Sequence, residues 1–337
     1  KPSITYVRFG FFSLAIAFIL ENEKNFTKYF YLIMCFTLLI LMIDGYFQFI
    51  TGKNTFGFKG IRPDRLGGLF FDELILGSYL GKILPIFCTF YLLNKECFNK
   101  YIVLIFILLI YFLVFLSGER AAFFTTTLYL IMVTPFLIGI RKSVIFFLLI
   151  GTLLTILITT NKNIKSRYID QMLMHTFIKT TNDSTFMPDH IGLFTSAIDI
   201  FKKNMVMGGG VKTFRINCKN TTNEKLMNLK IDIPNMTFCG SHPHNYYLQL
   251  LSETGVIGFL FVSIIFIKLI FNYIKQIFYL IKRNKNVSKE YVAILSGLIV
   301  YIWPLTTTGS FFNNWICSIL FLQIGVYLYI SKNEYKN

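Results

Sequence analysis

The chain has 337 residues, of which 54% are hydrophobic and only 15% are charged. Soluble domains carry about 25% charged residues, so this composition excludes an ordinary soluble enzyme and indicates a protein whose surface is largely solvated by lipid. The net charge of +16 does not indicate a nucleic-acid partner, because much of the positive charge sits in short segments between apolar runs, where it sets the orientation of membrane helices.

Nine apolar segments predict transmembrane helices, because a run of about 18 apolar residues can cross a bilayer. They are 4–20, 29–50, 70–93, 101–116, 121–140, 143–159, 249–274, 291–306 and 314–331. The predicted fold class is an all-α polytopic transmembrane helix bundle. Its parts are N-terminal helices at 1–159, one long loop at 160–248 and C-terminal helices at 249–337.

The charge of the connecting segments predicts the topology. Segment 275–290 holds Lys275, Lys282, Arg283, Lys285 and Lys289, and such basic segments stay in the cytoplasm. Alternation then places 51–69, 117–120, 160–248 and 306–313 on the opposite face. Segment 51–69 is basic although it lies on that outer face, so topology alone does not explain its Lys and Arg residues.

The long loop at 160–248 contains one predicted amphipathic helix, at 190–206. This helix is expected to lie on the membrane surface or against the bundle, and the glycines at 208–210 end it. Its apolar face is predicted from helical spacing to consist of Ile191, Phe194, Ala197, Ile198 and Phe201. Cys218 and Cys239 fall in the same loop, where an oxidising exterior would allow a disulfide, and the sequence leaves that pairing open.

Several ionisable residues gather on the predicted outer face, although they are far apart in sequence. Ionisable side chains at or within a bilayer are costly and default to a functional hypothesis. Arginine offers a fixed positive fork suited to phosphate oxygens, and histidine can accept a proton near neutral pH. These groups therefore favour a lipid-phosphate substrate, with no metal or cofactor required. The residues are Arg62, Arg65, Glu119, Arg120, His242, His244 and Glu253.

Structural alternatives exist for the same residues. A lone arginine at a helix end can reach toward lipid headgroups, and Arg120 can pair with Glu119 or another acid. The glycines at 255 and 258 can serve close helix packing. His242 and His244 could bind zinc together with other loop residues, namely His175, Asp189 or His190, although no third ligand lies at a diagnostic spacing. A transporter or lipid flippase without chemistry would instead carry charges at the bilayer midplane and broken helices in paired halves.

The motifs resemble those of the bacterial O-antigen ligases and the related O-antigen polymerases. His244 and Asn245, then "YYLQLLSET", then Gly255 and Gly258 match the ligase pattern of a histidine, a polar residue, nine residues and two spaced glycines. The family's earlier Arg-three residues-Leu pattern fits Arg62 with Leu66 and also Arg65 with Leu69. "SGERAAFF" is similar to the family's second arginine region, which makes Arg120 its counterpart, and "GGGVKTFR" ends in Arg215.

This resemblance implies a metal-independent, inverting glycosyltransferase with about twelve helices in the full protein, so about three would precede this chain. The implied donor is a glycan on undecaprenyl diphosphate, and the active face is the periplasmic side of the bacterial inner membrane. A ligase would transfer the glycan to a sugar hydroxyl of the lipid A–core. A polymerase would transfer it to a second lipid-linked glycan, and Asp72 and Glu73 leave that choice open.

The resemblance also implies roles for individual residues. His244 is expected to act as general base or to orient the acceptor, and Arg120 with Arg65 or Arg62 is expected to hold the diphosphate. Further residues expected near the substrate are Arg215, His242, Asn245, Glu119 and Glu253. The remaining partners are membrane lipids.

Overall fold

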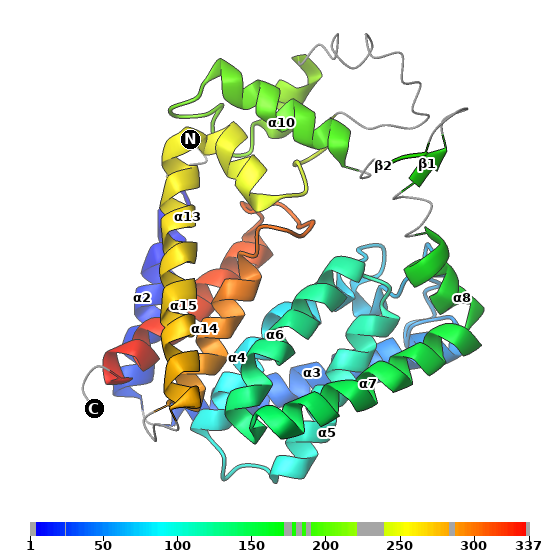
Figure 1. The fold of residues 1–337 in the computed structure, drawn as a ribbon, viewed down its shortest axis with the longest axis vertical. Coiled ribbons are helices and arrows are strands. Elements are labelled where there is room, and N and C mark those ends of the chain that lie inside the picture. Colours follow the sequence, from blue (N-terminus) through cyan, green and yellow to red (C-terminus); the bar gives the residue numbers. More distant parts are fainter. Residues whose placement is uncertain are drawn as a thin grey trace. The chain divides into compact units, whose positions relative to one another are not determined.

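The computed structural model describes residues 5–23, 25–171, 177–179, 184–186, 190–220, 239–282 and 287–334. Nearly all of the secondary structure in these residues is helical (Figure 1). Six helices among the described residues are long and apolar enough to cross a membrane. The predicted all-α polytopic bundle is therefore confirmed, and the chain is an integral membrane protein.

Within the described ranges, nine helices overlap the nine predicted segments, but three of them have fewer than 18 residues. These three are α2 (Val7–Asn22), α5 (Lys100–Leu116) and α14 (Lys289–Tyr301). Helix α14 ends early because Pro304 follows, and a residue before proline avoids the helical region. The other six are α3 (Phe26–Thr51), α4 (Leu76–Leu93), α6 (Arg120–Ile138), α7 (Ile140–Thr160), α13 (Tyr246–Ile281) and α15 (Asn314–Glu334).

Short elements connect these helices. They are η1 (Gly68–Phe70), α8 (Lys162–Lys165), the π-helical turn η2 (Ser166–Asp170), α10 (Ile191–Lys203), α11 (Phe214–Asn217) and η3 (Cys218–Asn220). The strands β1 (Phe177–Lys179) and β2 (Ser184–Phe186) form one antiparallel pair.

The chain divides into two compact units, which are described separately. Unit 1 comprises Lys1–Phe11, Met172–Ile270 and Ile302–Phe321. Unit 2 comprises Phe12–Gln171, Phe271–Tyr301 and Leu322–Asn337.

Helix α4 is the centre of unit 2, where it packs against α3, α5, α6 and α14. Pro85 of α4 sits so close to Gly297 of α14 that a Cβ at position 297 would lie 2.4 Å from the proline ring. Helix α7, by contrast, buries only Ser143 and Ile150. Most of its remaining apolar residues are exposed, as expected for a helix that faces lipid.

The connecting segments of unit 2 form two groups at opposite ends of its helices. Ion pairs join Lys95 to Glu290 at 3.0 Å and Lys332 to Glu21 at 2.6 Å. At the other end, the loop after α3 reaches the turn between α5 and α6, where the N–H of Leu66 donates to the carbonyl of Ser117. This grouping follows the alternation predicted from charge, while the assignment of faces stays a prediction.

The amphipathic helix of the long loop corresponds to α10 in unit 1, but its predicted face is partly wrong. The buried stripe consists of Leu193, Ala197 and Ile200, which pack against Phe214 and the half-cystine Cys218. Ile198, placed on the apolar face by its spacing, is 41% exposed. The stripe is rotated because this helix packs on a turn of its own loop, and the spacing of its apolar residues does not reveal that partner.

Candidate functional site

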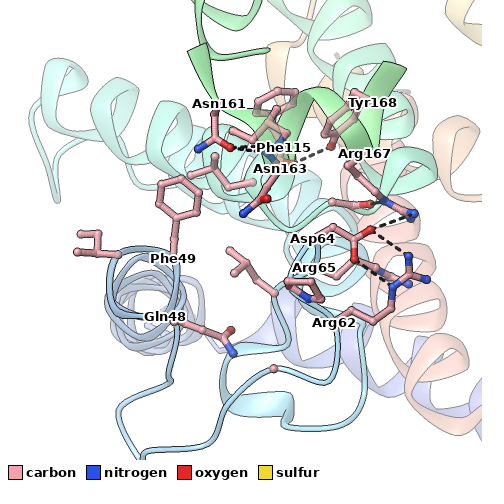
Figure 2. Close-up of a pocket in the computed structure, with 18 of the residues that line it drawn as sticks. Gln48, Phe49, Arg62, Asp64, Arg65, Phe115, Asn161, Asn163, Arg167 and Tyr168 are labelled. Atoms are coloured by element: carbon pink, nitrogen blue, oxygen red, sulfur yellow. Dashed lines mark hydrogen bonds and ion pairs between the residues drawn. The ribbon is translucent and has the colours of Figure 1, made fainter. Parts of the chain in front are cut away.

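Unit 2 contains a cavity of about 660 Å³ at the end where the loop after α3 meets η2 (Figure 2). Part of its lining is apolar and comes from Phe49, Ile50, Phe115 and Leu116. The polar lining includes Gln48, Lys59, Arg62, Asp64, Arg65, Asn161, Asn163, Arg167 and Tyr168. The cavity therefore combines a hydrocarbon-like wall with cationic groups.

Three polar side chains at the end of α3 and just beyond it hold the loop that carries the cavity's arginines. The Asp44 carboxylate accepts hydrogen bonds from the backbone N–H and the hydroxyl of Thr55, at 2.8 and 2.6 Å. The Gln48 amide oxygen accepts from the N–H of Gly68 at 2.8 Å, and the Asn54 amide donates to the carbonyl of Gly68 at 3.1 Å. All three side chains are buried, where a polar group is costly unless bonded, so these bonds fix the loop.

Four arginines, called the arginine cluster below, share this region: Arg62, Arg65, Arg120 and Arg167. Burial lowers the pKa of Arg167, and the charges of Arg120 and Arg65 lower that pKa further. Burial likewise lowers the pKa of Arg65, although the charge of Glu119 opposes this. Guanidinium groups stay protonated in proteins, so the cluster is a concentration of positive charge.

Asp64 is the acidic residue within the cavity wall. Its carboxylate accepts two hydrogen bonds from Arg62, at 3.1 and 3.0 Å, and one from the Gln171 amide at 3.1 Å. Arg167 lies 3.7 Å from the same carboxylate. Burial acts to raise the pKa of Asp64, but the hydrogen bonds from Arg62 and Gln171 outweigh it and lower that pKa.

Arg65 contacts the second acid of this end of unit 2. Its Nη2 donates to the carbonyl of Leu74 at 2.8 Å and lies 3.9 Å from the Glu119 carboxylate. Its Nε is buried and has no hydrogen-bond partner among the described residues. A buried donor without a partner is unfavourable, so Nε of Arg65 carries a cost that no hydrogen bond within the described residues offsets.

Glu119 anchors the turn between α5 and α6. Its carboxylate accepts from the N–H of Gly77 at 2.8 Å and from the hydroxyl of Ser78 at 2.5 Å, at the start of α4. Burial raises the pKa of Glu119, and the Ser78 bond and Arg65 charge oppose that rise. The next residue, Arg120, begins α6 and does not line the cavity.

Gly118 is needed where this turn meets the loop after α3. Its φ is +72°, and a Cβ there would lie 2.4 Å from the carbonyl oxygen of Asp64. Its own carbonyl accepts from Nε of Arg167 at 2.8 Å. A side chain at 118 would therefore push apart the segments that hold the two arginine-bearing loops.

Unit 1 carries the histidine turn, defined as residues 241–245, just before α13. Its two imidazoles gather with a third. The centroid of the His244 ring lies 4.6 Å from that of His190, with the rings stacked, and 4.1 Å from that of His242, with the rings tilted by 47°. Burial, with the charges of His242 and His190, lowers the pKa of His244 to about 4. Burial also lowers the pKa of His242. At neutral pH His244 is therefore uncharged and able to accept a hydrogen bond or a proton.

Backbone contacts with Thr308 fix the histidine turn. Nε2 of His242 lies 3.2 Å from the Thr308 carbonyl, which can only accept, so Nε2 carries the hydrogen and Nδ1 accepts from Ser241. The Thr308 N–H donates to the His244 carbonyl at 2.8 Å. His244 has φ +56°, a region that non-glycine residues rarely adopt.

Asn245 caps the helix that follows. Its side-chain oxygen accepts from the N–H groups of Tyr247 and Leu248, at 3.0 and 3.1 Å, and its amide donates to the Pro304 carbonyl at 2.8 Å. An asparagine at this position satisfies helix N–H groups that have no intrahelical partner. The polar residue of the motif therefore aligns the histidine turn with α13 in this structure.

Glu253 and Gly255 join α13 to the glycine-rich loop after α10. The Glu253 carboxylate accepts from the backbone N–H groups of Lys212 and Phe214, at 2.8 and 3.0 Å, and from the Gln249 amide at 3.2 Å. Gly255 has φ +66° and ψ −165°, which breaks the helical geometry of α13. A Cβ there would lie 2.2 Å from the Val206 carbonyl oxygen, so only glycine fits this approach.

The remaining predicted residues lie on exposed surfaces or in the disulfide of the long loop. Arg215 is exposed on the short helix α11. Cys218 and Cys239 form a disulfide with their Cα atoms 5.1 Å apart. The acids Asp72 and Glu73 are exposed in unit 2.

Sequence reasoning missed three residues of these sites. Arg167 and Gln171 were overlooked because they stand at the start of the polar loop, and Asp64 because it reads as a turn residue beside proline. The "RPDR" run was a usable signal for Asp64, since it places an acid between two arginines. His190 enters the sequence analysis only as a possible zinc ligand, and the tertiary structure instead stacks its ring on that of His244.

The zinc alternative rested partly on His175 and Asp189, which lie outside the described residues. Within the described part of the chain, no group of three or more His, Cys, Asp or Glu side chains is arranged to hold a metal ion. The described histidines instead make ring contacts with one another, stacked between His190 and His244 and tilted between His242 and His244.

Comparison with known protein families gives a match to part of the chain. Residues 104–263 match a family model described as O-antigen ligase. This segment includes Glu119, Arg120, Arg167 and the histidine turn, while Arg62 and Arg65 precede it. A search of curated proteins found no match to the chain.

Proposed function

We propose that this chain, which carries an O-antigen ligase family domain at residues 104–263, transfers a glycan from undecaprenyl diphosphate to a sugar hydroxyl of the lipid A–core. The reaction takes place at the periplasmic face of the bacterial inner membrane. The observation that carries the proposal is the arginine cluster beside a cavity of about 660 Å³ with an apolar wall. A lipid diphosphate has the same two parts, an anionic head and a hydrocarbon chain.

The reaction exchanges one bond at the anomeric carbon. The acceptor oxygen forms a bond to that carbon while the bond to the diphosphate oxygen breaks, and the bonding electrons leave with the diphosphate. The acceptor hydroxyl loses its proton to a base. The largest charge change therefore falls on the departing diphosphate, where preorganised cations stabilise the transition state most.

The arginines of unit 2 supply that stabilisation in the proposal. Arg65 offers a buried, unpartnered Nε, and Arg62 is 46% exposed and able to turn toward a ligand. Arg120 adds positive charge from the start of α6. A lysine could not replace the fork at these positions, because it donates from a single point charge.

His244 of unit 1 is proposed to receive the acceptor hydroxyl. Its imidazole is neutral at pH 7 and can accept from the hydroxyl, but a pKa of about 4 makes it a weak base before substrate binds. Negative charge from a bound substrate would raise that pKa. His242 supports this residue, and Asn245 and Glu253 hold its surroundings in place.

The alternative function is polymerisation, in which the acceptor is a second lipid-linked glycan. The exposed acids Asp72 and Glu73 near the cavity's loop keep this alternative open. A further alternative, a lipid-linked glycan transporter, requires no release of undecaprenyl diphosphate.

The decisive experiment supplies purified protein with one lipid-linked glycan donor and either lipid A–core or a second lipid-linked unit. Glycan on lipid A–core together with free undecaprenyl diphosphate is the expected result. Elongated lipid-linked glycan would identify a polymerase, and the absence of both products would contradict a transferase.

The residue roles have their own tests in the same assay. His244→Ala should abolish transfer, whereas Cys97→Ser, a matched change of an unpaired cysteine, should not. Transfer is expected to survive treatment with a metal chelator. Near-normal transfer by His244→Ala would remove that residue from the mechanism.

A further inference from the structure

The anion-binding groups of the cavity already hold an anion, which is the side chain of Asp64. Arg62 binds it with both nitrogens of its fork, at 3.1 and 3.0 Å. Gln171 donates to it at 3.1 Å, and Arg167 approaches to 3.7 Å. Figure 2 shows this carboxylate between the two guanidinium groups at the wall of the cavity.

A carboxylate and a phosphate compete for the same guanidinium fork. Both present two oxygens at a spacing that matches the planar donors of arginine. Arg62 can exchange one for the other, because its side chain is 46% exposed, whereas the side chains of Asp64 and Arg167 are each only 11% exposed. Arg167 is further fixed by its bonds to Gly118 and Gln171.

We infer that Asp64 is an internal counter-anion that weakens the hold of this cavity on diphosphate and favours release of the product. It keeps Arg62 and Arg167 paired when the cavity is empty, and its charge opposes an incoming phosphate. The inference rests on the proposed function, since it assumes that diphosphate binds at the arginine cluster.

The charge of Asp64 acts more strongly on product than on donor. In the donor the terminal phosphate is esterified to the sugar and carries one negative charge. In the product the same phosphate is free at one end and carries about 1.5 to 2 charges at pH 7. Repulsion by a fixed carboxylate grows with the charge of the ligand, so Asp64 selects against the leaving group.

The test measures binding of inorganic pyrophosphate to the full chain, purified in detergent, by isothermal titration calorimetry. Asp64→Asn removes the charge and keeps the shape. We expect it to bind pyrophosphate on the order of tenfold more tightly than the wild type, a change between the limits for a charge pair in water and near a protein surface. Glu290→Gln removes one charge at the other end of unit 2 and should leave the affinity unchanged. Asp64→Ser gives a second way to remove the charge and should show the same gain.

A purely structural role for Asp64 predicts the opposite sign. Asp64→Asn and Asp64→Ser would then bind pyrophosphate no better than wild type, or more weakly, because the arginines would lose their alignment, and this result overturns the inference. Arg65→Met separates the inference from the proposed function. If the wild type and Arg65→Met bind pyrophosphate equally, or neither binds it, the arginine cluster is not a diphosphate site and both fail.

Discussion

Gly255 is the position at which a single added methyl group should do the most damage to unit 1. In Gly255→Ala the new Cβ would sit 2.2 Å from the carbonyl oxygen of Val206 and 2.7 Å from the nitrogen of Gly208. Both contacts are to backbone, which cannot move aside as a side chain can. The φ of +66° with ψ of −165° is also a conformation essentially confined to glycine.

The cost can be worked from the contacts. Forcing alanine into this backbone conformation costs about 1–3 kcal/mol. Relieving the overlap separates the loop after α10 from α13 and stretches the bonds from Val256 to Met205 and from Gly209 to Ser252, at 2.8 and 2.9 Å. Each such bond contributes about 0.5–1.5 kcal/mol, so strain and the two bonds together amount to a loss of about 2–6 kcal/mol.

The assay is hydrogen exchange of the backbone amides of residues 205–214, compared between wild type and variant in detergent. A loss of about 3 kcal/mol corresponds to a fall in protection of more than a hundredfold. Gly10→Ala in α2 is the matched control, because its new Cβ would meet no atom within 4 Å beyond its chain neighbours and the adjacent backbone of its own helix, and alanine favours a helix. Equal protection in Gly255→Ala and wild type would refute the reasoning.

Three further predictions concern pH, the disulfide and Arg167. The pKa of His244 is about 4 in the folded protein and about 6.5 in the unfolded chain, so the unfolded chain binds protons first and stability should fall as pH drops from about 6.5 to 4. The melting temperature of His244→Gln should therefore depend less on pH over that window than the melting temperature of the wild type. An equal dependence would contradict the lowered pKa of His244. Cys218→Ser should lower the free energy of unfolding by about 2–4 kcal/mol. A reductant should lower the stability of the wild type by a similar amount and leave the stability of the variant unchanged. A melting temperature that neither change affects would show that the disulfide does not stabilise the fold. Arg167→Lys should weaken pyrophosphate binding and lower the melting temperature, because it loses the bonds to Gly118 and Gln171. Lys165→Arg, at an exposed position of the same segment, should change neither property. Identical melting temperatures for the two variants would contradict a stabilising role for the Arg167 bonds.

Much of the membrane fold was predictable because hydrocarbon forces long apolar segments to form helices. The nine apolar segments each overlap a helix, and the Gly–Ser–His–Pro–His–Asn run marks the start of α13. Helix ends were less predictable. The segment 70–93 was expected to be helical throughout, but α4 begins only at Leu76, after η1 and a short non-helical stretch. Gly68 of η1 is bonded to Gln48 and Asn54, and no feature of the hydropathy indicates that.

The candidate sites were predictable only in part. Arginines in a segment where topology does not need them pointed to Arg62 and Arg65, and the family resemblance pointed to Arg120. Arg167 and Gln171 join them through a π-helical turn, a geometry that arises from packing and has no sequence pattern of its own. The roles of Asn245 and Glu253 in capping and bracing also depend on which backbone N–H groups lie nearby, and that becomes visible only in three dimensions.

The nine residues between Asn245 and Gly255 set a fixed length and a fixed angle. From Asn245 to Gly255 the chain takes ten helical steps, which rise about 15 Å and turn through about 2.8 revolutions. This segment therefore sets both the distance and the angle between the cap beside His244 and the break that contacts the glycine-rich loop. One inserted residue would lengthen this helical segment by about 1.5 Å and rotate one of its ends by about 100° relative to the other. The number of residues between Asn245 and Gly255 therefore matters as much as the identity of the residues at the two ends.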